Sequence, residues 1–264
     1  ATVENGVVTG VANGSARITV RYEEAAATVN VSVVAAATKE QVNTFDEKYV
    51  NLYGRTYVDD NGLHLDGPAT AVEVGFIGTS LQMAVYSTAK TKMRVYVDGD
   101  LTGTKTDVAM GTKAYTLASG LADGYHTARI VKASEEQFGQ WDIEGFDADG
   151  FFMVPENTGL KIEFIGTSDT TGYAIGAYAS NDVTVTAENS DATMAYAYLT
   201  AQALGAKYSV VAKTGICTTV TGFWAGNYCM AGLYSCVSER NSANYAFDFR
   251  PDIIVVNLGT IESS

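Results

Sequence analysis

The sequence predicts a multidomain chain in which an all-β region precedes an α/β region. Residues 44–155 alternate short apolar strands with glycine-rich turns and show no helical period. From Lys161 onward, strand, helix and strand segments follow one another, an order typical of a parallel sheet. We therefore expect a β-sandwich or jelly roll first and a layered α/β domain second.

Composition limits the classes of partner. The 264 residues are 47% hydrophobic and 18% charged, which is enough for sizeable cores, and their net charge is −13. Nucleic acids and anionic membranes need a basic face, so neither is an expected partner. No apolar run reaches the roughly 18 residues of a membrane span. A neutral polymer such as a polysaccharide fits this balance better.

The cysteines leave two states open. Cys217, Cys229 and Cys236 are close in sequence and predict either one disulfide with a free thiol or three free thiols. A zinc site usually takes four ligands, and no histidine is close by in the sequence. We therefore expect no metal site and no other cofactor.

The N-terminal region predicts strands and then a linker. In residues 1–37, "ARITVRY" and "ATVNVSVV" have the period of half-buried strands, and Asn13-Gly14 marks a tight turn between them. Residues 38–43 predict a linker to the sandwich of residues 44–155. Within that sandwich, Asn61-Gly62 marks a hairpin, and Trp141 is expected in a core or interdomain position.

Residues 156–264 predict three strands and a helix. The strands are 161–166, 208–212 and 253–257, and the last is apolar almost throughout, as in strands buried on both faces. The segment "TMAYAYLTAQALG" predicts a helix that Gly205 ends. Its apolar face consists of Met194, Ala197, Tyr198, Ala201 and Leu204.

Several segments resemble carbohydrate esterase family 2. In chain order they are "YGRTY" (53–57), "VYVDGD" (95–100), "GLADGYHTARIVKASEEQFG" (120–139), "KIEFIGTSDTTGY" (161–173), "AYAYLTAQALGAKYSVVAKTG" (195–215) and "PDIIVVNLGT" (251–260). The resemblance spans residues 44–264. It implies a jelly roll joined to a three-layer SGNH-type hydrolase domain, here expected to be incomplete at its C-terminal end, that removes acetyl groups from plant polysaccharides such as xylan and mannan. Residues 6–37 resemble the second half of a bacterial Ig-like group-2 module.

The resemblance implies two catalytic residues. Gly166, Ser168, Gly172 and Tyr173 match the family's first block, which places Ser168 at the nucleophile position. Without the resemblance, a serine in such a turn is more often a helix cap. Gly215 matches the glycine whose N–H serves the oxyanion hole.

Three substitutions and one absence depart from the family pattern. Thr167 stands where the family has aspartate, and Ile261 and Glu262 stand where it has asparagine and aspartate. The family's downstream histidine base has no counterpart, because His64 and His126 both precede Ser168. Losing the base removes several orders of magnitude in rate, and losing the asparagine donor removes about 10²–10³, or about 3–4 kcal/mol. We therefore expect the 264-residue chain to be close to inert.

Three hypotheses of function remain open. The first is an extracellular polysaccharide O-deacetylase of the serine-esterase type, acting on acetylated plant polysaccharides or oligosaccharides. The second is a catalytically degenerate carbohydrate-binding module, which the three substitutions favour. The third is a surface spacer, which leaves the hydrolase-like segments unexplained. The first two place the chain in a larger multidomain protein, secreted or on a bacterial cell surface.

A glycine-rich loop carries aromatic residues that could bind sugar. Trp224, Tyr228 and Tyr234, with Phe223, follow the second α/β strand. Aromatic faces that line concave sites are common in ligand binding. The alternative is that these side chains pack beneath the loop.

Overall fold

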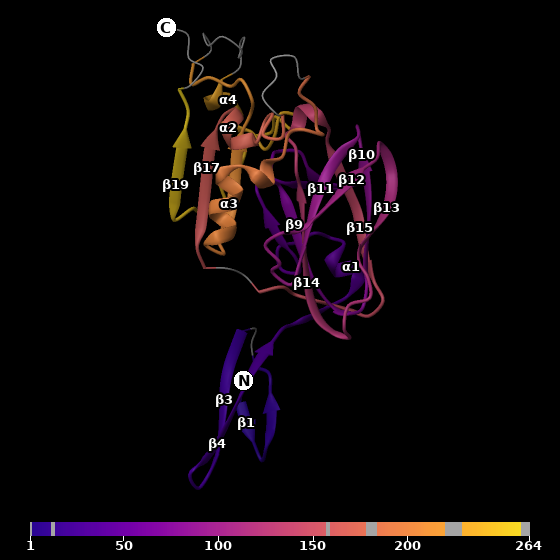
Figure 1. Ribbon diagram of the computed structural model, residues 1–264, viewed down its shortest axis with the longest axis vertical. Coiled ribbons are helices and arrows are strands. Elements are labelled where there is room, and N and C mark those ends of the chain that lie inside the picture. The colour runs from indigo at the N-terminus through magenta and orange to yellow at the C-terminus, as the bar shows by residue number, and fades with distance from the viewer. Residues whose placement is uncertain (1, 12–13, 157–158, 178–183, 220–228, 260–264) are drawn as a thin grey trace.

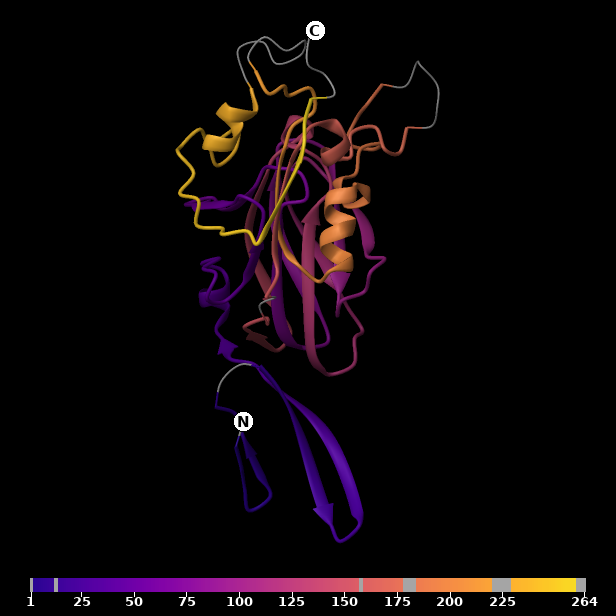
Figure 2. The same cartoon turned by 90° about the vertical axis from the view of Figure 1, so that its left-hand side faces the viewer.

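The computed structural model describes residues 2–11, 14–156, 159–177, 184–219 and 229–259 (Figure 1). Three parts follow one another: two N-terminal β-ribbons, a sandwich of two antiparallel sheets, and a parallel sheet with short helices. The ribbons extend away from the other two parts, which lie side by side (Figures 1 and 2). Within the described ranges, no helix has the length and apolar character needed to cross a membrane.

The N-terminal ribbons are almost fully exposed. β1 (Thr2–Glu4) pairs with β2 (Val7–Thr9), and β3 (Gly14–Tyr22) pairs with β4 (Ala25–Val33). The prediction of half-buried strands is wrong, because no second sheet covers either ribbon in the part that the structure describes. The predicted turn position is also wrong. Gly14 opens β3 and the hairpin turns after Tyr22, while Asn13 lies outside the described residues.

The predicted linker is part of the sandwich. α1 (Lys39–Val42) begins at Thr38, whose hydroxyl accepts the Gln41 N–H while the Gln41 side chain accepts the Thr38 N–H. This reciprocal capping box begins a helix where the sequence predicts a linker. Asn43 then joins the helix to the sandwich, since its side chain both accepts from and donates to the backbone of Phe146.

The sandwich confirms the all-β prediction for this region. Its seven-stranded sheet has the order β12-β11-β14-β9-β16-β5, with β6 also paired to β9. These strands are β5 (Ala36–Ala37), β6 (Asn51–Tyr53), β9 (Ala71–Gly78), β11 (Thr91–Val97), β12 (Thr104–Val108), β14 (Gly124–Lys132) and β16 (Phe151–Met153).

The second sheet of the sandwich has five strands in the order β13-β10-β15-β8-β7. They are β7 (Tyr57–Asp59), β8 (Gly62–Leu65), β10 (Leu81–Ser87), β13 (Gly111–Ala118) and β15 (Trp141–Ala148). The hairpin predicted at Asn61-Gly62 is present, because Asp59 pairs with Gly62 across a two-residue turn.

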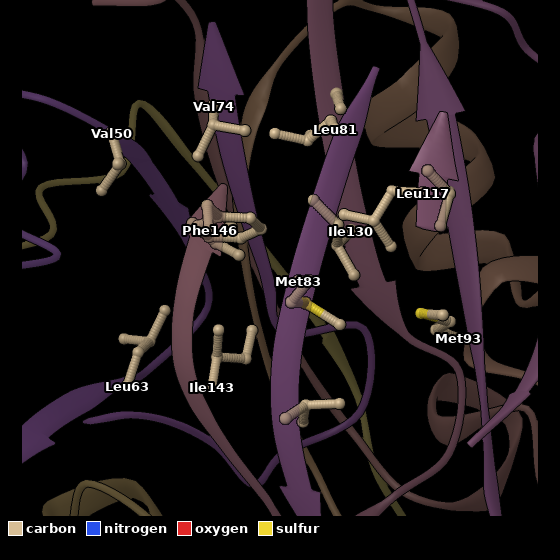
Figure 3. Packing of buried hydrophobic residues seen from close by; sticks show 14 of the residues in the cluster. Val50, Leu63, Val74, Leu81, Met83, Met93, Leu117, Ile130, Ile143 and Phe146 are labelled. Atoms are coloured by element: carbon tan, nitrogen blue, oxygen red, sulfur yellow. The ribbon is translucent and has the colours of Figure 1, made fainter. Parts of the chain in front are cut away.

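A continuous apolar core lies between the two sheets (Figure 3). Leu81, Met83 and Val85 alternate along β10 and are fully buried, as the period of a strand requires. Trp141 is also fully buried, and its Nε1 donates to Thr91 Oγ1 at 2.7 Å. Of the two positions expected for Trp141, core or interdomain, the structure shows the core position.

The α/β part contains the three predicted strands in parallel. β17 (Lys161–Gly166) lies between β18 (Lys207–Ala212) and β19 (Ile253–Asn257). α3 (Tyr196–Ala203) packs on one face of this sheet and α4 (Met230–Ser235) on the other (Figure 2). The remaining helical turns are η1 (Glu136–Phe138), α2 (Ser168–Thr171) and η2 (Ala192–Met194).

Two burial predictions for the α/β part are wrong. β19 is an edge strand that leaves Ile253, Ile254 and Val256 exposed, because in the described ranges only β17 pairs with it. The apolar face of α3 is shorter than predicted. Met194 lies in η2 and Leu204 caps the helix, so both are exposed.

Candidate functional site

Ser168 opens a one-turn helix directly after β17. The turn needs glycine on both sides. A Cβ on Gly166 would lie 1.8 Å from Thr170 Oγ1, and a Cβ on Gly172 would lie 2.2 Å from the Asp191 carbonyl oxygen. Gly172 also has φ +70°, a conformation that favours glycine. The two glycines therefore let the chain fold tightly around Ser168.

Gly215 lies in the turn after β18, at the same edge of the sheet. Gly166 and Ala212 are register partners in adjacent parallel strands, so both turns leave the carboxyl edge where open α/β sheets bind ligands. Gly215 has φ +80°, and Ile216 beyond it is buried against α4. The structure thus brings the turns of the two predicted catalytic residues together.

Two threonine hydroxyls join these turns. Thr171 Oγ1 lies 3.0 Å from Thr214 Oγ1 and 3.1 Å from the Ser168 carbonyl oxygen. The Thr214 hydroxyl donates to Glu135 Oε1 at 2.7 Å. Since that uses the proton of Thr214, Thr171 donates either to Thr214 or to the Ser168 carbonyl.

Three polar groups of the two predicted catalytic residues have no hydrogen-bond partner in the described part of the chain. No described residue accepts a hydrogen bond from the backbone N–H of Ser168 or Gly215, and none bonds the half-buried Ser168 hydroxyl. Two N–H donors and one hydroxyl therefore have no protein partner among the described residues. The neighbouring Thr167 is buried, and its hydroxyl has no partner among the same residues.

His126 is held within the sandwich. Its Nδ1 lies 2.6 Å from Asp98 Oδ2 and its Nε2 lies 2.7 Å from the Ala122 carbonyl oxygen. The hydrogen bond to that carbonyl and the Asp98 carboxylate raise the pKa of His126. His126 precedes Lys132 by six residues in β14, which places it about 20 Å along the strand from the end that approaches Ser168.

His64 is also engaged elsewhere. It is buried in β8, with Nε2 2.8 Å from Asp59 Oδ1 and Nδ1 2.7 Å from Asp142 Oδ1. Neither contact has hydrogen-bond geometry, so both ring nitrogens lack a hydrogen-bond partner among the described residues. The Tyr57 ring stacks on the imidazole at 4.1 Å. Both ring nitrogens thus face carboxylates of the sandwich rather than Ser168.

The predicted sugar-binding aromatics are only partly placed. Trp224 and Tyr228 lie outside the described residues, as do Ile261 and Glu262. Tyr234 is in α4, where its hydroxyl donates to Glu163 Oε2 at 2.8 Å and its ring packs 4.6 Å from the Arg55 guanidinium. One face and the hydroxyl of Tyr234 are therefore engaged. Sugar stacking on its other face stays a prediction.

Arg55 connects the sandwich to the α/β part and was missed as a site residue. Its guanidinium lies 4.0 Å from the Tyr245 ring and 3.5 Å from Glu163, and it donates to two backbone carbonyls, those of Tyr234 and Cys236. Burial lowers the pKa of Arg55. The sequence signal for Arg55 is its place in "YGRTY", one of the segments that resemble carbohydrate esterase family 2.

Three comparisons with known proteins agree. Residues 52–155 match the family model described as carbohydrate esterase 2 N-terminal. The chain is 29% identical over 211 residues to the cellulase/esterase CelE of Acetivibrio thermocellus, covering 79% of this chain and 26% of that protein. It therefore spans about a quarter of the length of this curated relative.

Solved structures show the same fold. One is a family two carbohydrate esterase from Clostridium thermocellum in complex with cellohexaose, 28% identical with a TM-score of 0.73, covering 80% of this chain and 66% of that chain. Another is a carbohydrate esterase family 2 enzyme with a carbohydrate-binding domain from Corynascus thermopiles (Myceliophthora fergusii), 29% identical with a TM-score of 0.65, covering 80% and 65%.

An acetyl xylan esterase from Butyrivibrio proteoclasticus shares the fold at 23% identity with a TM-score of 0.73, covering 87% of this chain and 65% of that chain. Residues 52–155 match the N-terminal domain model of carbohydrate esterase family 2. Over 79–80% of its length, the chain is similar to carbohydrate esterases of that family.

Proposed function

We propose that this chain carries the acyl-transfer site of a carbohydrate O-deacetylase of the serine-esterase type. In this proposal Ser168 is at the nucleophile position, and the N–H groups of Ser168 and Gly215 form the oxyanion hole. One observation supports it: the two turns lie at one sheet edge and are joined through Thr171 and Thr214, and among the described residues the two N–H groups and the Ser168 hydroxyl have no hydrogen-bond partner.

The residues suit ester cleavage chemically. Ser168 Oγ would attack the acetyl carbonyl carbon as a base removes its proton, and the carbonyl oxygen would become an oxyanion between the two N–H groups. Collapse would break the bond to the sugar oxygen, which leaves with a proton as a free hydroxyl. Water would then attack the acetyl-serine and release acetate.

In this proposal, no histidine of the described residues acts as the base for this first step. Both histidines face partners in the sandwich. A serine without a base keeps only the contributions of the oxyanion hole and of binding. We therefore expect the 264-residue chain to hydrolyse 4-nitrophenyl acetate no faster than its Ser168→Ala variant. A Ser168-dependent rate well above this control would show that a base is present.

Binding without turnover is the second candidate. The clostridial relative has cellohexaose bound, and the missing base favours a site that holds sugar without cleaving it. Titration calorimetry with cellohexaose and with acetylated xylo-oligosaccharides tests this role. Binding that persists in Ser168→Ala without acetate release supports the binding module. Absence of binding, together with Ser168-dependent acetate release, supports the esterase.

The same proposal extends to context. We infer a jelly roll for the sandwich and an SGNH-type topology for the α/β part, within a larger multidomain protein at the cell surface or outside the cell. The acidic composition and the resemblance to an Ig-like spacer module support this placement. Detection of the protein in culture medium or on intact cells with an antibody tests it, and recovery only after lysis would contradict it.

A further inference from the structure

A short segment of the sandwich reaches beneath the Ser168 turn. Residues 133–139, here named the sandwich arm, follow β14 and contain η1. The carbonyl of Ala133 accepts the Ala192 N–H at 2.5 Å, and the Phe138 ring stacks 6.1 Å from the ring of Tyr173, which follows α2. The sandwich arm therefore contacts the α/β part at two points near the Ser168 turn, Ala192 and Tyr173.

Glu135 is the central residue of this contact. It is 3% exposed, and both of its carboxylate oxygens are used. Oε2 accepts the Thr214 backbone N–H at 2.9 Å, while Oε1 accepts the Thr214 hydroxyl at 2.7 Å and the Gln137 side chain at 2.7 Å. Thr171 Oγ1 lies 3.5 Å from the same Oε1.

This arrangement fixes the geometry of both turns. Holding the Thr214 N–H and hydroxyl together leaves little freedom to the peptide that carries the next N–H, that of Gly215. Thr171 Oγ1 lies 3.0 Å from the Thr214 hydroxyl that Glu135 accepts and 3.1 Å from the Ser168 carbonyl oxygen, and its one proton bonds to either of them at a time. Hydrogen bonds to an ionised acceptor are about twice as strong as neutral ones, so the charge of Glu135 matters as well as its shape.

We propose that Glu135 is a positioning residue through which the sandwich sets the oxyanion turn of Gly215 and the turn of Ser168. The site is then a joint product of both domains. The functional meaning of this inference rests on the proposed function, because the turns matter for catalysis only if they bind an oxyanion. Its geometric content is independent of activity.

Glu136 provides a matched control from the same segment. Its carboxylate accepts the backbone N–H groups of Glu239 and Arg240 at 3.0 and 2.6 Å, and it contacts neither turn of the site. Both carboxylates thus link the sandwich to the α/β part by accepting backbone N–H groups. Of these two carboxylates, only that of Glu135 does so at the site. The variants Glu135→Gln and Glu136→Gln therefore separate an effect on the site from a general loss of contact between the sandwich and the α/β part.

Hydrogen exchange of the intact 264-residue chain, followed by mass spectrometry, tests the proposal. In Glu135→Gln we expect exchange in peptides covering 167–173 and 212–217 to accelerate at least about tenfold, since a charged acceptor is lost. Peptides from β10 and β15 should stay unchanged. Glu136→Gln should accelerate exchange at 239–240 only. Thr214→Ser should keep wild-type protection of the site peptides, and Thr214→Val should lose part of it.

The exchange rates measured for Glu135→Gln decide between the positioning role and a merely structural one. Unchanged exchange at both site peptides in Glu135→Gln would overturn the proposal, and so would acceleration spread evenly over the sandwich core, which indicates a merely structural role. A failure of the proposed function would give a different set of results. Exchange at the site peptides would still accelerate in Glu135→Gln, but acetyl esters would show no Ser168-dependent hydrolysis and saccharides would show no saturable binding.

Discussion

The hydroxyl oxygens of Thr171 and Thr214 lie 3.0 Å apart, which connects the turn after β17 to the turn after β18. Neither residue was predicted from the sequence to belong to the site, although their contact joins the turn of Ser168 to the turn of Gly215. Parallel pairing of β17 and β18 puts the two turns at one sheet edge. The hydroxyls, together with Glu135, then hold the turns against each other.

Substitution of Gly166 tests the tight turn before Ser168. Gly166→Ala would place a methyl group 1.8 Å from Thr170 Oγ1 and 2.6 Å from Thr170 Cβ. We expect α2 to move and the free energy of unfolding to fall by about 1–3 kcal/mol, as for other overpacked sites. Urea denaturation measures the change. Gly124→Ala is the control, because nothing lies within 4 Å of its added Cβ. Equal loss of stability in both variants would contradict a steric need for glycine at position 166.

Removal of Arg55 tests the interdomain cation. Arg55→Met leaves the buried Glu163 carboxylate without the guanidinium 3.5 Å away, and breaking a buried pair by removing one partner costs about 3–5 kcal/mol. The double variant Arg55→Met, Glu163→Gln removes both charges. We expect it to recover part of the loss in thermal denaturation. If the double variant is less stable than the sum of the single changes, the ion pair is not the cause.

The buried Lys132 predicts a pH dependence of stability. Its Nζ donates to the carbonyls of Asp66 and Ser134, and burial lowers its pKa to about 8, against about 10.4 in an unfolded chain. Between these values the unfolded chain holds more protons than the folded one. Lys132 therefore makes the free energy of unfolding rise with pH over this window.

The matched variants are Lys132→Met and, at an exposed position, Lys48→Met. From pH 8 to 9.5 we expect the stability of the wild-type chain relative to Lys132→Met to increase by about 1.6 kcal/mol. The range stops there because burial raises the pKa values of several tyrosines, among them Tyr53 and Tyr198, which oppose the trend at higher pH. If the difference in free energy of unfolding between the wild type and Lys132→Met does not change with pH, as expected for Lys48→Met, Lys132 is not neutral in the folded chain.

Local sequence patterns predict much of the fold but few of the contacts that hold the candidate site in place. The β-branched run in 253–257 and the helix stop at Gly205 are local signals, and both elements form as expected. The exposure of β19 depends on which segments pair with it, and no single run of residues encodes that. The contact of Glu135 with Thr214 joins residues 79 apart in sequence, so no periodicity could have indicated it.

In the proposed function, Ser168 and its oxyanion donors are positioned for acyl transfer, while no base among these 264 residues reaches the Ser168 hydroxyl. Imidazole added as an external base tests this most directly, with acetate release from acetylated xylan as the readout. Without imidazole, we predict equal release by the wild type and Ser168→Ala. With imidazole, the wild type and His126→Asn should release acetate alike and faster than Ser168→Ala. Ser168-dependent release without imidazole, or none at any imidazole concentration, would contradict the claim.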